Sequence, residues 1–558
     1  MNAQFVIPTD RNPDLVTLTV KVDDNVIPGT VRLNAVSVYA ETNRVPTARL
    51  VIYDGEPAMQ DFPTSNLDIF NVGKSIEILA GYHSIEKSIF KGIIVKHSIR
   101  VRESQFLLVL ECKHPAFRMT LNRRSRCFHD LKDSQAMESI LREYDLNPAV
   151  QASATVRQEI VQYDLTDWDF LQVRAEANGM VCIANADSVS IAPPNLEQDP
   201  VVAPVFGGSI IELDLETDAR QQPEVIKATA WDFINQEMAE SESTEPDLPP
   251  SGQTDGHTQA AAIEAGEAIL RHAGRGKTDD LQIWANAQLL RQRMARTRGK
   301  IVIQGNHLTQ PGNLLQLHGV GNQFNGKAFI SGVTHEISGG NWHAHVQLGL
   351  NPEPFAATYD IQPLPAAGRF GGVNGLVTGL VTQLGGDPDS ADRIRVHLPM
   401  LTEGSQGIWA RQASLDAGNQ RGAFFRPEIG DEVIVGFLND DPNDAVVLGM
   451  LHSPDKPAPL PTDDDNNLKG FVSRSGIELL FDDDKKALTL STPAGKTLLL
   501  DDQGRMLKLE DENGNKIEFT TSGITIQTNG NLTLKAAANA ELSGGAMATL
   551  KGSIVKIN

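Results

Sequence analysis

The chain has 558 residues, a net charge of −22, 47 glycines and 30 prolines, and only 6% of its residues are aromatic. A chain of this length is too long to fold around a single hydrophobic core, so several domains are expected. The composition favours short strands and turns over a helical protein. The negative charge disfavours nucleic acid and anionic membrane surfaces as direct partners, so we expect no nucleic acid binding and no stable membrane anchoring.

Cysteine usage and the N-terminus indicate the compartment of folding. Cys112, Cys127 and Cys182 are an odd number without CxxC spacing, which predicts reduced, buried thiols and no zinc site. The first residues lack the basic and apolar regions of a signal peptide, and no run of 18 apolar residues predicts a membrane helix. We therefore expect folding in the cytoplasm.

The first domain is expected to span residues 1–365. Residues 1–115 alternate apolar and polar side chains, as strands with one buried face do. Two helices should follow. Asp133 can cap the first, whereas Thr166 or Asp167 can cap the second, which Gly179 ends.

The second half of this domain begins with an unusual segment. Residues 239–258 are acidic and proline-rich, which predicts an exposed, mobile loop. Residues 259–298 have a helical pattern with a break at glycines, and strands return between residues 300 and 348. Prolines within residues 352–365 then mark a domain boundary.

Residues 370–453 predict a small barrel. Five short alternating strands in about eighty residues suit an OB-type fold. A turn should precede its fourth strand, because Pro427 fixes φ and Gly430 permits a tight turn. We assign Glu428 and Asp431 to hydrogen bonding in the turn and at an interface, not to a catalytic carboxylate pair.

A linker at residues 454–470 leads to a repetitive needle at residues 471–558. Its strands alternate apolar and polar residues, so each has one apolar and one polar face. The turn glycines recur nine or ten residues apart, at Gly495, Gly504, Gly514 and Gly523. Such short strands cannot bury a core alone. Three chains wound into a prism fit best, and a single-chain β-helix is the alternative. With about eight strands stacked at ~4.8 Å, the needle would be roughly 40 Å long.

Three motifs carry a resemblance to a known family. They are Thr166-Asp167-Trp168-Asp169-Phe170-Leu171 followed by Gly179, then Arg426-Pro427-Glu428-Ile429-Gly430-Asp431 followed by Gly436 and Gly449, and Ser473-Arg474-Ser475-Gly476-Ile477. In order and spacing they resemble the VgrG family, the spike proteins of type VI secretion systems, phage tails and extracellular injection particles.

The resemblance implies a mainly β, multidomain homotrimer: an α+β region like the phage tail hub, an OB barrel and a triple-stranded intertwined β-helix. It also implies inner tube and baseplate proteins as partners, with effector cargo as a further candidate. Open strand edges at the far end predict a small tip protein of the PAAR type, bound at Ile554, Val555, Ile557 and Asn558.

The function expected from this resemblance is a spike without catalysis. It would join the inner tube to the tip and puncture a target envelope when the sheath contracts, ending outside the cell or inside the target. The alternative is a spike that carries an envelope-degrading hydrolase or effector activity. Against it, residues 452–468 leave no room for a lysozyme domain between barrel and needle, and we expect no fused effector.

The remaining candidates for chemistry are weak. His335-Glu336 lacks the second histidine of an HExxH zinc site, and no phosphate loop, nucleophile elbow or dinucleotide fingerprint is present. His343 and His345 share one side of a predicted strand, and a metal site formed by them with His335 is the alternative to consider. We favour ordinary strand residues there, and we expect no metal and no cofactor.

Overall fold

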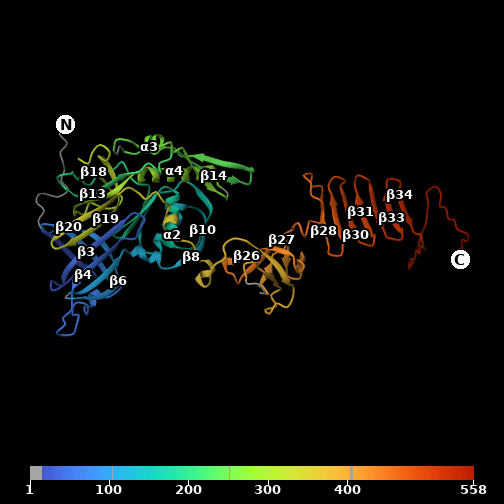
Figure 1. Ribbon diagram of the computed structural model, residues 1–558, viewed down its shortest axis with the longest axis horizontal. Helices are drawn as coiled ribbons and strands as arrows, with labels where there is room; N and C mark the ends of the chain where they lie inside the picture. Colours follow the sequence, from blue (N-terminus) through green and yellow to red (C-terminus); the bar gives the residue numbers. More distant parts are fainter. Residues whose placement is uncertain (1–14, 104, 250–251, 275, 402–405, 558) are drawn as a thin grey trace. The chain divides into compact units, whose positions relative to one another are not determined.

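The computed structural model describes residues 15–103, 105–249, 252–274, 276–401 and 406–557. The chain forms two units, residues 1–363 and 364–558, which are treated separately below. Strands predominate in both, as expected for a mainly β protein (Figure 1). Among the described helices, none combines the length and the apolar character needed to cross a membrane.

One twelve-stranded sheet dominates the first unit, in the order β13-β17-β20-β19-β3-β4-β7-β6-β5-β1-β2, with β18 paired to β19. Its strands are β1 (Val16–Val22), β2 (Asn25–Val26), β3 (Arg32–Glu41), β4 (Thr47–Tyr53), β5 (Ser75–Tyr82), β6 (Ile85–Arg102), β7 (Gln105–Lys113), β13 (Ile210–Thr217), β17 (Thr297–Gln304), β18 (Leu314–Leu317), β19 (Gly326–Ser338) and β20 (Asn341–Leu348). Because β19 pairs with β3, segments about 300 residues apart meet in one sheet. The strands predicted before residue 115 and after residue 300 are present.

A second core lies between two helices and two small sheets. Helices α1 (Asp133–Arg142) and α2 (Asp167–Ala177) pack with β8 (Arg123–Lys132), β9 (Asn147–Val150), β10 (Val156–Thr166), β11 (Val181–Asn185) and β12 (Ser188–Ala192). Trp168 and Phe170 are both buried in this core. The predicted cap of α2 is confirmed, since Thr166 Oγ1 accepts the Asp169 N–H at 3.1 Å. Gly179 follows the helix with φ +68°, a conformation that suits glycine.

Asp133 does not cap α1 as predicted. It is the first residue of the helix, and Lys132 holds the cap position. Its buried carboxylate accepts hydrogen bonds from Arg157 Nε at 3.0 Å and Arg174 Nε at 2.9 Å. The carboxylate is therefore used to join β10 and α2, an association that sequence spacing does not reveal.

The segment predicted as one loop and one broken helix is divided differently. Strand β15 (Glu237–Glu242) and helix α3 (Gly256–Ala262) take up both ends of the predicted loop. Between them, Glu245 pairs with the buried Arg293 at 2.7 Å and fastens this acidic stretch to the unit. The predicted helix is interrupted by a strand, β16 (Glu267–His272), before helix α4 (Thr278–Ala295). Parallel pairing of β16 with β14 (Val225–Asp232) overrides the helical pattern there.

The second unit begins with a closed five-stranded barrel, as predicted. Its strands are β21 (Val377–Gln383), β22 (Ile394–His397), β23 (Ile408–Gln412), β26 (Glu432–Phe437) and β27 (Ala445–Met450), with a small hairpin of β24 (Ala417–Gly418) and β25 (Arg421–Gly422). Val381, Ile394, Val433 and Val435 lie in its core, each at most 1% exposed.

A seven-stranded antiparallel sheet follows the barrel in the chain. Its strands are β28 (Leu468–Val472), β29 (Glu478–Asp482), β30 (Ala487–Ser491), β31 (Thr497–Asp501), β32 (Met506–Glu510), β33 (Lys516–Thr520) and β34 (Gly523–Gln527), each paired with the next. The sheet thus starts inside the predicted linker. Six inter-strand steps of ~4.8 Å give a length of roughly 29 Å, which is shorter than predicted.

The end of the chain differs from the prediction. Residues 528–557, all described, contain no strand, so neither Leu532–Leu534 nor Ile554–Ile557 offers a strand edge. The physical reason is that a strand needs a hydrogen-bonding neighbour, and β34 is the last paired strand of this single chain. Asn558, predicted to contact a tip protein, lies outside the described residues.

Candidate functional site: the open apolar face of the C-terminal sheet

The sheet β28–β34 has one apolar face. Directly paired residues share a face, as do residues two apart in one strand. The pairings place two rows of side chains side by side, which we call the two apolar columns. The first is Phe471, Leu479, Leu490, Leu498, Leu509, Ile517 and Ile526, and the second is Phe481, Leu488, Leu500, Leu507, Phe519 and Ile524, preceded by Lys469.

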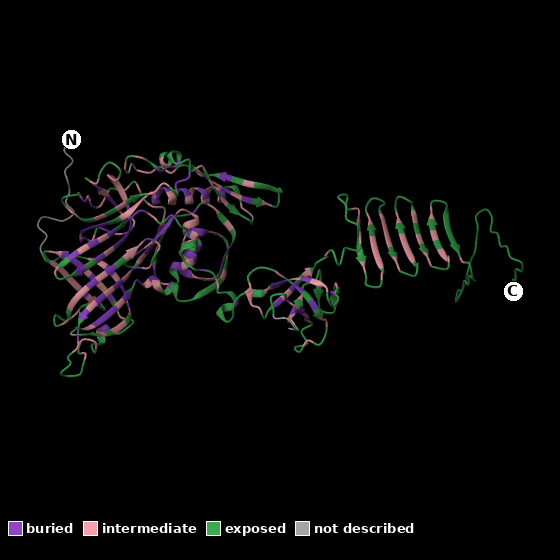
Figure 2. Ribbon diagram, viewed as in Figure 1, coloured by how far each residue is buried: buried purple, intermediate pink, exposed green. Residues whose placement is uncertain are grey.

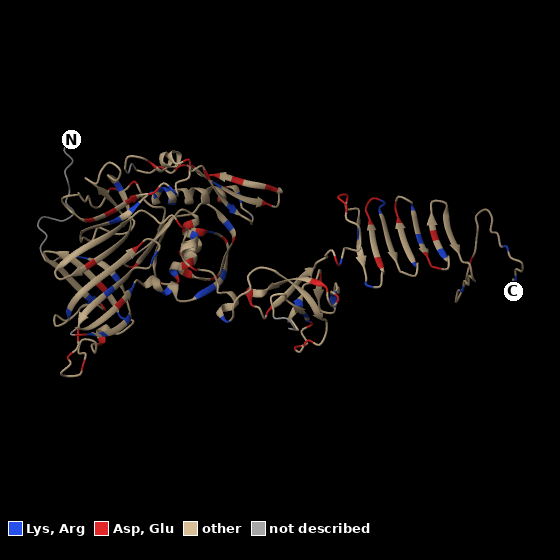
Figure 3. Cartoon of the chain, viewed as in Figure 1, with Lys and Arg blue, Asp and Glu red and all other residues tan. Residues whose placement is uncertain are grey.

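The other face is mostly polar. Thr489, Lys508 and Glu518 lie in its central row, and its charges pair locally, with Lys516 Nζ 2.8 Å from Glu518 Oε2. The acidic residues of the turns follow the edges of the sheet (Figure 3). The alternation predicted from the sequence is therefore confirmed, with one face fit for burial and one for water.

None of the described residues covers the apolar face. Between residues 451 and 557, all described, no residue is buried (Figure 2). Leu509 is 50% exposed, Ile526 52% and Ile524 64%. Stable domains pack at least two layers around a core, so a lone layer with an apolar face is an incomplete fold. Covering the exposed half of each such side chain contributes roughly 1 kcal/mol.

The turn at Arg426–Asp431 of the barrel is built as its residue types suggest. Asp431 Oδ2 accepts the Glu428 N–H at 2.8 Å, and the Asp431 N–H donates to Glu428 O at 3.0 Å. Gly430 has φ +86°, and Pro427 is buried. Lys456 Nζ donates to Asp431 Oδ1 at 2.9 Å. These contacts describe a rigid turn.

Glu428 reaches from this turn to the start of the sheet. Arg474 Nη1 lies 2.9 Å from Glu428 Oε2, so the barrel and the segment after β28 are joined by an ion pair. The two strand glycines of the motif differ in their surroundings. A Cβ at Gly436 would meet Leu376 and Leu448 at 3.2 and 3.4 Å, whereas one at Gly449 would find no atom nearer than 3.9 Å.

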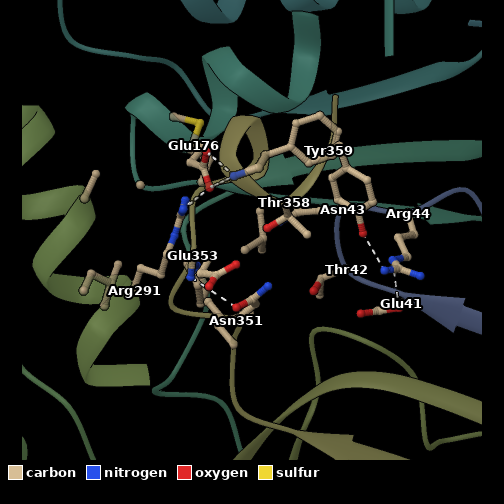
Figure 4. Close-up of a pocket in the computed structure, with 18 residues that line it drawn as sticks. Glu41, Thr42, Asn43, Arg44, Glu176, Arg291, Asn351, Glu353, Thr358 and Tyr359 are labelled. Carbon is tan, nitrogen blue, oxygen red and sulfur yellow. Dashed lines mark hydrogen bonds and ion pairs between the residues drawn. The ribbon is translucent and has the colours of Figure 1, made fainter. Parts of the chain in front are cut away.

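A small polar pocket lies in the first unit (Figure 4), with a volume of about 100 Å³. Its charged residues serve the fold: Glu176 pairs with Arg291, and Arg44 contacts the Tyr359 hydroxyl. Burial raises the pKa of the Glu176 carboxyl, and Arg291 opposes that rise. Ligand pockets usually measure about 300–1,000 Å³, so this one does not suit a substrate.

The histidines discussed for metal binding are not brought together. His335 pairs with Ala344 across the sheet, so its side chain lies on the face opposite His343 and His345. Burial lowers the pKa of His335 to about 4, and its Nδ1 accepts the Trp342 Nε1–H at 3.3 Å. Among the described residues, no three His, Cys, Asp or Glu side chains form a metal-binding group.

The cysteines are unpaired in the structure. Cys112 and Cys182 are buried, as expected, and burial raises the pKa of each thiol to about 12. Cys127 is exposed, which contradicts the prediction that all three are buried. It lies on the outward face of the two-stranded sheet formed by β8 and β10, where it pairs with Val161.

Sequence reasoning also missed a buried charge within the first motif. Asp167 is fully buried, and its carboxylate accepts from Arg126 Nη2 at 2.6 Å, Tyr144 Oη at 2.6 Å and Gln162 Nε2 at 2.8 Å. The sequence pattern indicates Asp167 only as an alternative cap of α2. Three donors on one buried carboxylate hold β8, β10 and the segment just after α1 against α2, which is a structural role.

Comparison with known families is consistent with this architecture. A family model described as the Alg8 N-terminal domain matches residues 12–339, more than half of the chain. The type VI secretion system/phage-baseplate injector OB domain matches residues 377–452, and the phage baseplate V C-terminal trimerisation domain matches residues 487–558. Because the first of these models covers more than half of the chain, the chain belongs to the family of the Alg8 N-terminal domain, and it also carries the injector OB and C-terminal trimerisation domains. The trimerisation-domain match includes five of the seven strands of the C-terminal sheet, β30 to β34.

Two curated proteins match this chain at low sequence identity. It is 25% identical over 384 residues to the type VI secretion system spike protein VgrG3 of Vibrio cholerae, covering 61% of this chain and 35% of the relative. It is 26% identical over 385 residues to the actin cross-linking toxin VgrG1 of the same species, covering 60% and 32%. The chain thus spans about a third of the length of these relatives.

Among solved structures, an E. coli type VI secretion component that is similar to the T4 phage tail proteins gp27 and gp5 covers 77% of this chain. The match includes 99% of that chain, with 12% identity and a TM-score of 0.38.

Proposed function

We propose that this protein is the central spike of a contractile injection machine and that it pierces a target envelope when the sheath contracts. The observation that carries the proposal is the pair of apolar columns on an otherwise uncovered sheet. Three copies that turn these columns toward a common axis bury them and form a stiff prism. The first unit would then meet the inner tube and baseplate, as the hub of a phage tail does.

Rigidity under axial load supports the piercing role. Each strand of β28–β34 pairs with the next in the chain, so every interior strand has its backbone groups bonded on both sides. Packing against two other copies adds the missing layer. A tip built this way resists bending, because bending must break hydrogen bonds and apolar contacts together.

The test compares two adjacent residues on opposite faces of β30. Leu490→Asp places a charge in the first apolar column, whereas Thr489→Asp places the same charge on the polar face. We expect the unsubstituted protein and Thr489→Asp to sediment as trimers, and Leu490→Asp as single chains. Trimers of Leu490→Asp, or single chains of the unsubstituted protein, would contradict the proposal. Particles assembled with Leu490→Asp should also fail to release dye from target cells.

We propose further that the spike is not an enzyme. The supporting observations are that the motif carboxylates Glu428 and Asp431 are engaged in turn and junction contacts and that His335 is buried away from His343. The alternative, a hydrolase or effector activity, has some support in the name of the toxin relative. Peptidoglycan and lipid hydrolysis assays on the purified trimer distinguish the two, and turnover that survives repurification would favour the alternative.

The far end is proposed to receive a small tip protein of the PAAR type. Ile554 and Ile557 are 75% and 89% exposed and belong to an unpaired tail of the single chain. In a trimer, this tail gains neighbours and can present a flat apolar platform. Deleting residues 552–558 should leave the trimer intact and remove the tip protein from purified particles. Full retention of the tip protein would count against this assignment.

The location of the spike protein before and after firing follows from the same proposal. The protein would fold in the cytoplasm, join a particle, and reach the outside or the target cell only on firing. Fractionation before and after sheath contraction tests this, since the spike should move from the particle fraction to the target-cell fraction. Recovery of the spike in the producer membrane would contradict it.

A further inference from the structure

Aromatic side chains lie exposed where the barrel meets the sheet. Phe425 of the barrel stacks on Phe471 of β28, with ring centroids 5.2 Å apart and planes at 13°. The stack does not bury either ring, since Phe425 remains 56% exposed and Phe471 47%. Phe471 is the first residue of the first apolar column, so the stack extends that column onto the barrel.

The barrel does not need these side chains for its own core. The closed barrel is filled by aliphatic residues such as Val381, Ile394 and Val435. Phe425 and Ile429 lie outside it, and Ile429 is 64% exposed on the turn before β26. An aromatic ring buries about 150–250 Å² when covered, so leaving such groups in water forgoes a large stabilisation.

The charges beside these apolar groups are paired within the chain. Arg474 Nη1 lies 2.9 Å from Glu428 Oε2, and Arg426 pairs with Asp392. Like charges from identical subunits repel where three copies converge, and local pairing reduces that repulsion. The surroundings of Phe425 and Ile429 are therefore compatible with close approach of an identical surface.

We infer that the interface between copies continues from the apolar columns onto the barrel, where Phe425, Ile429 and Phe471 pack against a second copy of this chain. We call these three residues the junction strip. The inference rests on the proposed function, because it adds a second contact region to the same trimer. Continuity supports it: a partner that covers Phe471 at the head of the column also reaches the ring stacked on it.

Solvent protection of one introduced thiol tests the junction strip. Ile429→Cys is made in a Cys127→Ser background, because Cys127 is the one exposed cysteine among the three. Its rate of maleimide labelling is then compared between the trimer and the single chains of the Leu490→Asp variant. We expect labelling to be slower in the trimer by about tenfold or more, as for a site that must open before it reacts. Ser390→Cys, on the exposed loop after β21, should label equally in both.

A second pair of variants links the protection to the aromatic stack. Phe425→Asp should restore fast labelling of Ile429→Cys while the sheet keeps the protein trimeric, whereas Phe425→Leu should preserve the protection. If Ile429→Cys labels as fast in the trimer as in single chains, the junction strip is wrong. The same holds if Ser390→Cys is protected in the trimer as strongly as Ile429→Cys. Either result leaves the proposed function standing. Failure of the unsubstituted protein to form trimers overturns the proposed function itself.

Discussion

The carboxylate of Glu176 accepts the Phe355 N–H with both oxygens, at 3.0 and 2.9 Å, and pairs with the guanidinium of Arg291. It thereby holds helix α5 (Phe355–Thr358), near the end of the first unit, against α2 and α4 (Figure 4). Arg123 adds hydrogen bonds to the carbonyls of Ile361 and Gln362, each at 3.2 Å. The last segment of this unit is therefore fastened at several points.

Glu176→Gln should loosen this attachment. The amide keeps the shape of the side chain but leaves the largely buried Arg291 without its counter-charge. Removing one partner of a buried ion pair costs roughly 3 kcal/mol. Chemical denaturation should show that loss, and hydrogen exchange should show faster exchange at α5. Glu353→Gln, an exposed residue that lines the same pocket, should change stability by less than about 0.5 kcal/mol. Equal effects of the two variants would contradict the attachment.

The stability of the first unit should fall at acid pH through Asp133. Burial tends to raise the pKa of this carboxyl, but Arg174, Asn178 and Arg157 outweigh burial and hold the pKa below its ordinary value. A lowered folded-state pKa stabilises the fold above the unfolded-state pKa, about 3.9, and this stabilisation is lost as the pH falls below that value. We expect Asp133→Asn to be less stable at pH 7 and to show a shallower loss below about pH 4. Thermal unfolding between pH 2.5 and 7 measures both, and parallel curves for the two proteins would refute this assignment.

The turn before β26 should depend on the backbone of Gly430. Alanine at φ +86° is strained although the space is open, because the nearest atom to an added Cβ is Lys456 Nζ at 3.7 Å. Gly430→Ala should cost roughly 1–2 kcal/mol. Gly449→Ala in β27 is the control, since it has ordinary φ and room for a methyl group, and it should be neutral or slightly stabilising. Urea unfolding of the two variants decides the point, and an equal loss would show that backbone strain is not the cause.

Thiol chemistry should separate Cys127 from the other two cysteines. Burial raises the pKa of Cys112 and Cys182 to about 12, so neither forms a thiolate at neutral pH. Mass spectrometry after brief maleimide treatment should find one label, on Cys127, and three after denaturation. Cys127→Ser should remove the label from the native protein. Rapid labelling of Cys182 in the native protein would be inconsistent with its burial.

Local sequence patterns correctly predicted the elements that depend on neighbouring residues or on a regular alternation of apolar and polar side chains. The alternation in residues 477–527 gave the apolar and polar faces of the C-terminal sheet, and Thr166 identified the start of α2. The five barrel strands were also found from alternation and turns. In each case the information lies within about ten residues, so the sequence pattern and the structure carry the same signal.

The errors share a different cause, which is contact between distant segments. Glu267–His272 has a helical pattern but becomes β16 because β14 offers a parallel neighbour. Asp133 has the spacing of a cap but meets Arg157 and Arg174 from other elements. Each of these outcomes depends on tertiary packing, which overrides local preference.

The pairing of every needle strand with its immediate successor also bears on how the protein is made. Contacts between sequence neighbours form quickly, because little loop entropy is lost before they are made. The sheet can therefore fold within one newly made chain, well before that chain associates with two other copies. In that interval the apolar face of the sheet is exposed to other molecules, and exposed apolar surfaces aggregate at ordinary cellular concentrations. Production of this protein should consequently depend on keeping nascent copies close together, for instance on a shared messenger, and dilute expression should favour clumping over assembly.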